Sequence, residues 1–371
     1  MKILHFFSKI ALLCVALLFI TGEYLNPSIA NDDLNLCKSD YRVCMLTLLM
    51  DSVVKSGNYN GVLLVAENGH VIFRKAYGKS KIDTAHKFAQ TSQMQLASVS
   101  KPFTAAAIMM LKERGLLDFD DNITKYIPEL RYKDITVRHL LNHSSGIPDY
   151  INESRRFKKT FYRKTWLTND DLVEYLAKNK TPQYFKAGER HEYSNTGYAL
   201  LATIVERVSG ESFAEFMQKN IFDKTGMKNT FLCSPERRPK MLRDKEPLDG
   251  ILGDKGIFST VDDMFAWDRI LYTNRLISQE TLEEAYTEST TNKGKTFNYG
   301  YGWRIRKPEY EEPIIYHKGL WQGANPFFIR FVKCNRTVIS LHPADNLNSW
   351  GLVFGINRVL NESEYMCFKN F

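Results

Sequence analysis

Ser98 and Lys101 stand three positions apart at the start of a segment with a helical pattern of apolar residues, Pro102 to Leu116. In a helix this spacing puts the two side chains on one face. A lysine that is partly desolvated and near another positive charge can lose its proton near neutral pH and accept the proton of a serine hydroxyl. The N-terminus of the helix would add a partial positive charge and a backbone N–H for a developing oxyanion. The pair predicts a serine nucleophile with a lysine as its proton partner.

The same spacing recurs at Ser52 and Lys55, so the spacing alone is not specific. We interpret Ser52 as a surface residue of a helix. Ser98 has a different context, because apolar residues precede it and Pro102 follows within the first helical turn, where proline is tolerated. The nucleophile is therefore assigned to Ser98.

Two further motifs carry groups that could act beside such a pair. Tyr193 and Asn195 occur in the loop before a helical pattern that begins at Tyr198, and a tyrosine near a lysine can act as a base or a proton relay. His317 and Gly319 precede a strand-like segment, and a glycine on an edge strand lets a substrate backbone approach closely. Each motif is weak alone, but the order S-x-x-K, Y-x-N, H-x-G is specific.

With its three motifs in this order, the chain resembles the serine β-lactamase-like, penicillin-recognising hydrolases. It is similar to the branch with class C β-lactamases, D-alanyl-D-alanine carboxypeptidases, D-aminopeptidases and related esterases. The resemblance also includes residues 135–148, 193–198 and 256–260, and it extends from about residue 50 to residue 345.

The resemblance implies a role for each motif residue. Ser98 would be acylated, Lys101 would be its proton partner, and Tyr193 would be the base or relay that also serves deacylation. Asn195 would orient the substrate amide, and the N–H groups of Ser98 and Leu320 would form the oxyanion hole. His317 and Gly319 would line the substrate site. The resemblance implies neither a metal nor an organic cofactor.

His317 distinguishes among the members of this family. Class C β-lactamases usually have a lysine at this position, and histidine is more similar to the carboxypeptidase, aminopeptidase and esterase members. An imidazole with a pKa of about 6.5 is largely uncharged near neutral pH, unlike an ammonium. We therefore expect an acyl-enzyme hydrolase of ester, D-amino-acid peptide or lactam carbonyls with weak β-lactam turnover. A β-lactamase proper, or a penicillin- or peptidoglycan-binding sensor without turnover, is the alternative. Lys318 could supply the missing cation, although we expect it to point away from the cleft.

The apolar patterns predict an α+β fold with strands at both ends of the chain and helices between them. Two apolar runs flank Asn68-Gly69, which is typical of a hairpin. The resemblance implies a β-lactamase/transpeptidase-like fold with a mostly helical subdomain at about residues 105–250. The strand-like segments are 61–66, 71–76, 302–306, 325–331 and 337–341, and the helical ones are 102–116, 137–142, 170–177, 198–208 and 212–220.

The first thirty residues have the pattern of a secretory signal peptide. Residues 10–20 form an apolar run shorter than the roughly 20 residues that span a bilayer, and Ser28-Ile29-Ala30 fits a cleavage site. We expect residues 1–30 to be removed and residues 31–371 to form the catalytic domain, secreted or periplasmic. An uncleaved membrane anchor is the alternative.

Five cysteines would remain in the exported protein: Cys37, Cys44, Cys233, Cys334 and Cys367. An odd number in an oxidising compartment leaves at least one thiol without an intramolecular disulfide. We predict a disulfide between Cys37 and Cys44, with a pairing of Cys334 and Cys367 as the alternative.

The charge balance indicates an anionic partner. Removing residues 1–30 takes away two lysines and one glutamate and lowers the net charge from +8 to +7. This fits contact with an anionic cell-wall polymer or membrane surface, while the substrate would be a small molecule or a peptidoglycan-derived peptide or ester. Residues 155–164 are basic and aromatic, but in an exported protein we interpret them as a solvated loop and expect no nucleic acid. His139 and His143 lack the glutamate of a zinc motif and are interpreted as structural.

Overall fold

The computed structural model describes residues 40–79, 87–161, 163–237, 246–308, 312–343 and 347–367. The chain divides into two compact units, one of residues 1–59 with 346–371 and one of residues 60–345. The predicted signal peptide and Cys37 lie outside the described residues. Within the described residues, no helix is both long enough and apolar enough to cross a membrane.

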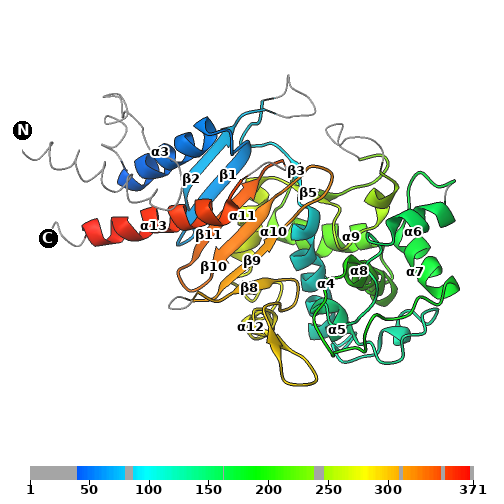
Figure 1. Cartoon of the computed structure of the whole chain (residues 1–371). Helices are drawn as coiled ribbons and strands as arrows, with labels where there is room; N and C mark the ends of the chain where they lie inside the picture. The colour runs from blue at the N-terminus through cyan, green and yellow to red at the C-terminus, as the bar shows by residue number, and fades with distance from the viewer. Residues whose placement is uncertain are drawn as a thin grey trace, which may run out of the picture. The chain divides into compact units, whose positions relative to one another are not determined.

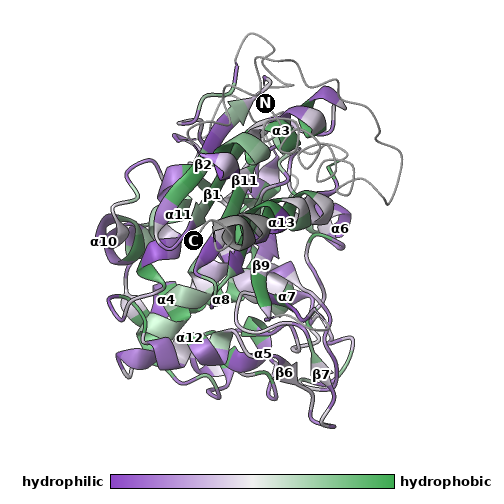
Figure 2. Cartoon of the chain, turned by 90° about the vertical axis from the view of Figure 1, so that its left-hand side faces the viewer, coloured by the Kyte–Doolittle hydropathy of each residue, from purple (hydrophilic) through white to green (hydrophobic). Residues whose placement is uncertain are grey.

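The first unit contains the helices α3 (Tyr41–Lys55) and α13 (Ser349–Cys367), which contact each other. The carboxylate of Asp40 caps α3 by accepting the N–H of Arg42 at 2.9 Å. Apolar residues recur on one face of α13, which is largely green in Figure 2, and they are buried: Leu352, Val353, Ile356, Val359 and Leu360. Ser52 lies within α3 and is partly exposed, as expected for a surface helix.

Six antiparallel strands form the main sheet of the second unit, in the order β2-β1-β11-β10-β9-β8 (Figure 1). Asn68 and Gly69 have positive φ at the turn between β1 and β2, as the hairpin pattern predicts. The early hairpin pairs with the late strand β11, so both ends of this unit share one sheet. The strands are β1 (Gly61–Glu67), β2 (His70–Tyr77), β8 (Arg304–Arg306), β9 (Ile314–Lys318), β10 (Phe327–Phe331) and β11 (Arg336–Leu341).

The helices of this unit lie mainly between the two groups of strands in sequence. They are α4 (Lys101–Glu113), α5 (Val137–Leu141), α6 (Ser154–Thr160), α7 (Asn169–Lys178), α8 (Asn195–Ser209), α9 (Phe213–Met217), α10 (Asp223–Thr225), α11 (Val261–Ile270) and α12 (Gln279–Ala285). Single turns are η1 (Ala97–Ser100), η2 (Ile123–Lys125), η3 (Gln218–Phe222) and η4 (Pro247–Gly250). Short strands pair as β3 (Met94–Gln95) and β4 (Phe231–Leu232) with β5 (Ile257–Ser259), and β6 (Ser289–Thr290) with β7 (Thr296–Phe297).

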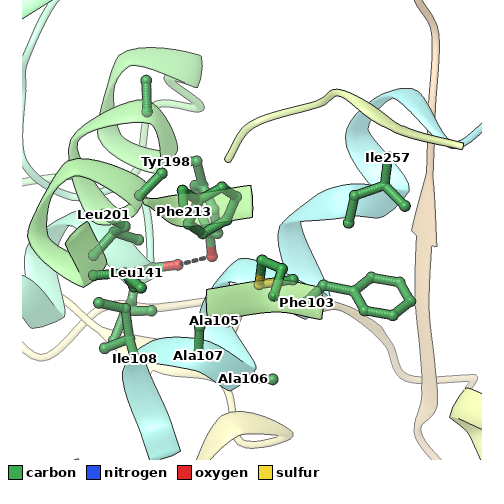
Figure 3. Packing of buried hydrophobic residues seen from close by; sticks show 14 of the residues in the cluster. Phe103, Ala105, Ala106, Ala107, Ile108, Leu141, Tyr198, Leu201, Phe213 and Ile257 are labelled. Atoms are coloured by element: carbon green, nitrogen blue, oxygen red, sulfur yellow. Dashed lines mark hydrogen bonds between the residues drawn. The ribbon is translucent and has the colours of Figure 1, made fainter. Parts of the chain in front are cut away.

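Helix α4 forms the centre of the hydrophobic core. Its residues from Lys101 to Leu111 are all buried, and Phe103 stacks on Trp267 with ring centroids 4.3 Å apart. Helix α4 packs against α8, whose Tyr198 hydroxyl donates to the Leu141 carbonyl at 2.6 Å (Figure 3). This packing fixes the position of the first residue of α4, Lys101.

The structure tests one of the two predicted disulfide pairings. Cys334 is an exposed free thiol, so the alternative pairing of Cys334 with Cys367 is wrong for this structure. Cys44 is disulfide-bonded. Because Cys37 lies outside the described residues, its pairing with Cys44 stays a prediction.

Candidate active site

Ser98 lies on the tight turn η1, between β3 and α4. Ala97 has φ +45°, a left-handed conformation that costs a non-glycine residue about 1–3 kcal/mol and is found mainly at functional sites. The turn leaves Ser98 partly exposed, while Ala97, Val99 and Ser100 beside it are buried. The backbone therefore presents one hydroxyl at the surface of a buried turn.

Gly319 lets strand β9 approach this turn. A Cβ atom at Gly319 would lie 2.6 Å from the Leu96 carbonyl oxygen and 2.9 Å from the Ala97 Cβ. No side chain fits at these distances. The third motif thus lies directly against the turn that carries Ser98. The close approach of a substrate backbone to Gly319 stays a prediction.

Lys101 is fully buried and uses all three of its N–H bonds inside the protein. Its Nζ donates to Ser98 Oγ at 3.1 Å, to Asn195 Oδ1 at 2.7 Å and to the Asp254 carbonyl at 2.9 Å. Burial lowers the pKa of Lys101 to about 8, helped by Arg304 and opposed by the carboxylates Asp254 and Asp149. Lys101 therefore loses its proton more readily near neutral pH than an exposed lysine does, and its neutral form can accept a proton from Ser98.

Asn195 is the first residue of α8, and its side chain connects Lys101 to a buried carboxylate. Its Nδ2 donates to Asp149 Oδ2 at 2.7 Å, and its backbone N–H donates to the same oxygen at 3.1 Å. The amide oxygen accepts from Lys101, so the orientation of the amide is fixed by both partners. Asn195 therefore orients Lys101, and its expected contact with a substrate amide stays a prediction.

Tyr193 lies above the lysine, with Lys101 Nζ 4.9 Å from the centre of its ring. Burial raises the pKa of the Tyr193 hydroxyl, while its hydrogen bond to Ser98 and the charge of Arg304 oppose this rise. The hydroxyl is therefore a neutral phenol near neutral pH. Between the two expected roles, this favours a proton relay over a phenolate base, and it leaves the basic role to Lys101.

His317 is fully buried on β9, so it cannot act as an exposed cation. Its Nδ1 lies 2.8 Å from the Lys318 carbonyl, which can only accept, and its Nε2 lies 3.0 Å from the Tyr299 hydroxyl. Burial holds the pKa of His317 well below its usual value, and the charges of Arg304 and Lys101 lower it further. The ring is neutral, as expected from the sequence. Lys318 follows it on the opposite face of β9, because successive side chains alternate in a strand.

Arg304, on β8, is a cation of the site that sequence reasoning missed. Its guanidinium carbon lies 4.9 Å from the ring centre of Tyr193 and 5.8 Å from that of Tyr299. Arg304 is partly exposed, and among the described residues no carboxylate forms an ion pair with it. The guanidinium therefore keeps donors available for an anionic group beside Ser98. No motif signalled Arg304, because a single arginine after Trp303 has no distinctive pattern.

His143 holds the loop that carries Tyr193. Its carbonyl accepts the N–H of Glu192 at 2.9 Å, its Nδ1 accepts the N–H of Ser194 at 3.2 Å, and its ring lies 4.2 Å from that of Tyr193.

Helix α5 ends before His143, which has φ +60°, while His139 caps the start of that helix at Thr136. The two histidines therefore do not share a helix face. Among the described residues, no group of three or more metal-binding side chains converges.

The predicted oxyanion donors are the backbone N–H groups of Ser98 and Leu320. Ser98 is in the first turn of a helix, where backbone N–H groups have no acceptor within the helix. Leu320 follows Gly319 and is 69% exposed, and its N–H donates to no backbone group of the described residues. Both N–H groups are available for a substrate oxygen.

Comparison with known proteins identifies the family. The family model described as Beta-lactamase matches residues 47–341, so the chain belongs to this family. The chain is 33% identical to penicillin-binding protein 4* of Bacillus subtilis (strain 168) over 321 residues, which cover 80% of this chain and 70% of the relative. It is 25% identical to the putative penicillin-binding protein PbpX of the same organism, over 79% of this chain and 72% of the relative.

Solved structures share the fold. The octameric penicillin-binding protein homologue from Pyrococcus abyssi is 25% identical, with a TM-score of 0.72 over 85% of this chain and 77% of that one. The D-amino acid amidase from Ochrobactrum anthropi SV3 has a TM-score of 0.73 at 20% identity, over 88% of this chain and 100% of that one. The predicted α+β, β-lactamase/transpeptidase-like fold is confirmed.

Proposed function

We propose that this protein is a serine hydrolase that forms an acyl-enzyme on Ser98 and acts on D-amino-acid peptide or amide carbonyls. The observation that carries the proposal is the buried Lys101, whose Nζ lies 3.1 Å from Ser98 Oγ and whose pKa is lowered to about 8. A serine with a base at this distance is activated as a nucleophile.

The proton steps follow from these contacts. Neutral Lys101 accepts the proton of Ser98 as Oγ attacks the carbonyl carbon, and the N–H groups of Ser98 and Leu320 bind the oxyanion. Lys101 then passes this proton to Tyr193, and the Tyr193 hydroxyl gives its own proton to the leaving nitrogen as the bond between that nitrogen and the carbonyl carbon breaks. Water then attacks the ester on Ser98 and gives its proton to the same Lys101–Tyr193 pair, which releases the acid and restores the serine.

Arg304 supports a substrate that carries a carboxylate next to the scissile bond. Hydrogen bonds from a guanidinium to a carboxylate are about twice as strong as those between neutral groups. The expectation of weak β-lactam turnover rests on the uncharged His317 alone and does not take this cation into account. We therefore place D-peptides with a free C-terminal carboxylate first among the substrates, in keeping with the penicillin-binding relatives.

A panel of substrates tests the proposal. The wild-type protein and Ser98→Ala are assayed with a D-alanyl-D-alanine peptide, D-phenylalanine amide, p-nitrophenyl acetate and a chromogenic cephalosporin. The proposal predicts turnover of the peptide or the amide that Ser98→Ala abolishes. A cephalosporin hydrolysed faster than every other substrate would indicate a β-lactamase proper, and acylation without any turnover would indicate a sensor.

Export and an anionic surface partner are part of the same proposal. They rest on residues 1–30, which are outside the described residues, and on the net charge of +8. N-terminal sequencing of the mature protein from the producing cells tests the cleavage after Ala30. A mature protein that begins at Met1 would contradict it.

A further inference from the structure

A second buried lysine, Lys255, lies next to the residue whose carbonyl binds Lys101. Lys255 is 2% exposed. Its Nζ donates to the Tyr150 hydroxyl at 2.6 Å and to the Ile251 carbonyl at 2.9 Å, and it lies 3.5 Å from Asp254 Oδ1. The mechanism given above does not use this lysine.

Asp254 is the carboxylate that Lys255 accompanies. It is 1% exposed, and its Oδ2 accepts the Tyr150 hydroxyl at 2.9 Å. Its Oδ1 has no hydrogen bond among the described residues, so Lys255 is the nearest cation to it there. Removing one partner of a buried ion pair leaves an uncompensated charge, which is costly.

This carboxylate acts directly on Lys101. Among the charged groups around Lys101, Asp254 makes the largest contribution to its pKa, followed by Asp149, and both raise it. Arg304 lowers the pKa of Lys101, and Lys101 and Lys255 repel each other. The other titratable groups facing Lys101 are held neutral by burial: His143, Tyr193, Tyr198 and His317.

Lys255 also lies under the segment that carries the predicted oxyanion donor. Its Nζ is 5.1 Å from the ring centre of Trp321, the residue after Leu320. The Trp321 Nε1 donates to Asp249 Oδ1 at 2.9 Å. The lysine therefore contacts both the Asp254 turn and the β9–β10 connection.

We propose that Lys255 is a positioning residue that neutralises the charge of Asp254 and thereby lets Lys101 act as a base near neutral pH. The inference deepens the proposed function, because it rests on Lys101 as the base for Ser98. Without Lys255, the uncompensated carboxylate would stabilise the protonated form of Lys101. Lys101 would then need a higher pH to accept the proton of Ser98.

Lys255→Met tests this by removing the charge while keeping most of the side-chain volume. The readout is the rate of acylation by a fluorescent penicillin between pH 6 and 10. We expect the rising part of this profile to move up by about one pH unit, so that acylation slows about tenfold at pH 7 and stays near the wild-type rate at pH 10. An unchanged profile would overturn the proposal.

Asp254→Asn separates the charge from a merely structural role, because the variant keeps the carbonyl that binds Lys101. Alone, it should move the rising part to lower pH, since it removes the negative charge that favours protonated Lys101 and leaves the positive charge of Lys255 offset only by Asp249. In the double variant Asp254→Asn/Lys255→Met, which has no buried charge at either position, the profile should return to within about half a pH unit of the wild type. A double variant that keeps the shift of Lys255→Met would overturn the proposal. If Lys255→Met does not fold, the comparison of Asp254→Asn with the double variant decides the question, because these two proteins differ only at Lys255.

A titration that needs no activity separates this proposal from the proposed function. Protein labelled with ¹³C-lysine is titrated by NMR, with the Lys101 signal assigned from Lys101→Arg. A wild-type protein that penicillin never acylates contradicts the proposed function. A Lys101 titration that is unchanged in both Lys255→Met and Asp254→Asn contradicts the role of Lys255.

Discussion

Lys101 is fully buried and donates three internal hydrogen bonds, and these two features act on its pKa in opposite directions. Burial alone would favour loss of its proton, whereas Asp254 and Asp149 favour its retention. The resulting pKa of about 8 lies close to physiological pH, where a base is most effective.

The sequence could predict the serine–lysine pair because three-residue spacing in a helix is local. It could not predict Asp149, Asp254 or Arg304, since they reach the site only through tertiary contacts.

Arg304 is predicted to bind the carboxylate of the substrate. Arg304→Gln removes the unpaired guanidinium and should lower kcat/KM for a D-alanyl-D-alanine peptide about 10- to 100-fold, because a charged hydrogen bond contributes about 1.5–3 kcal/mol. Hydrolysis of p-nitrophenyl acetate should change less than about threefold. Both are measured at pH 9, above the pKa of Lys101, to exclude an effect through that lysine.

Arg306→Gln is the matched control, since it removes the same charge from the same strand, two residues away. It should leave both substrates near their wild-type rates. Equal losses on the peptide and the ester in Arg304→Gln would contradict recognition of a carboxylate.

The side chains of the site come from the turn η1 and from four elements around it, α4, α8, β8 and β9, of which α4 and β9 contact the turn. Sequence patterns placed α4 and α8 within a few residues, because both are long and apolar. Strand β9 was not predicted, although it contains His317, since only Ile314 and Ile315 precede its polar residues. Hydrogen-bonded pairing with β10 and β8 makes this segment a strand. Such pairing between separate segments cannot be read from the short sequence pattern of β9 itself.

The close packing of β9 against η1 is predicted to need a glycine at position 319. Gly319→Ala would place a Cβ 2.6 Å from the Leu96 carbonyl oxygen and 3.0 Å from Pro326 Cγ, so β9 or η1 must move. Overpacking of this kind costs about 1–3 kcal/mol, and the displacement should also slow acylation of Ser98 at least about tenfold. Thermal unfolding and acylation by a fluorescent penicillin measure the two effects.

Gly355→Ala is the control for this substitution. Its Cβ would meet only the flexible side chain of Leu49, at 3.3 and 3.5 Å, within the first unit. Acylation should be unchanged there. A Gly319→Ala protein that acylates at the wild-type rate would contradict the close approach of β9 to η1.

At the scale of the whole molecule, a buried ion pair joins the sheet to a helix. Arg330 on β10 donates to Asp268 on α11 at 2.6 Å, and both side chains are fully buried. Asp268→Asn leaves the arginine uncompensated and should lower the free energy of unfolding by about 3–5 kcal/mol. Urea unfolding measures this loss, and the acylation rate of the folded fraction should stay unchanged.

Asp262→Asn is the matched comparison on the same helix. Asp262 pairs with Arg74 at 2.6 Å, but the two side chains are 39% and 40% exposed. Its loss should cost less than about 1 kcal/mol. Similar losses in the two variants would contradict the distinction between buried and exposed pairs.

Acylation of Ser98 is the step on which the proposed mechanism depends. Mass spectrometric mapping of the trapped adduct tests this acylation directly. The wild-type protein, Ser98→Ala and Ser52→Ala are each incubated with a penicillin, digested and analysed by tandem mass spectrometry. We expect one adduct, on Ser98, that is absent in Ser98→Ala and unchanged in Ser52→Ala. An adduct on any other residue, or undiminished labelling of Ser98→Ala, would contradict it.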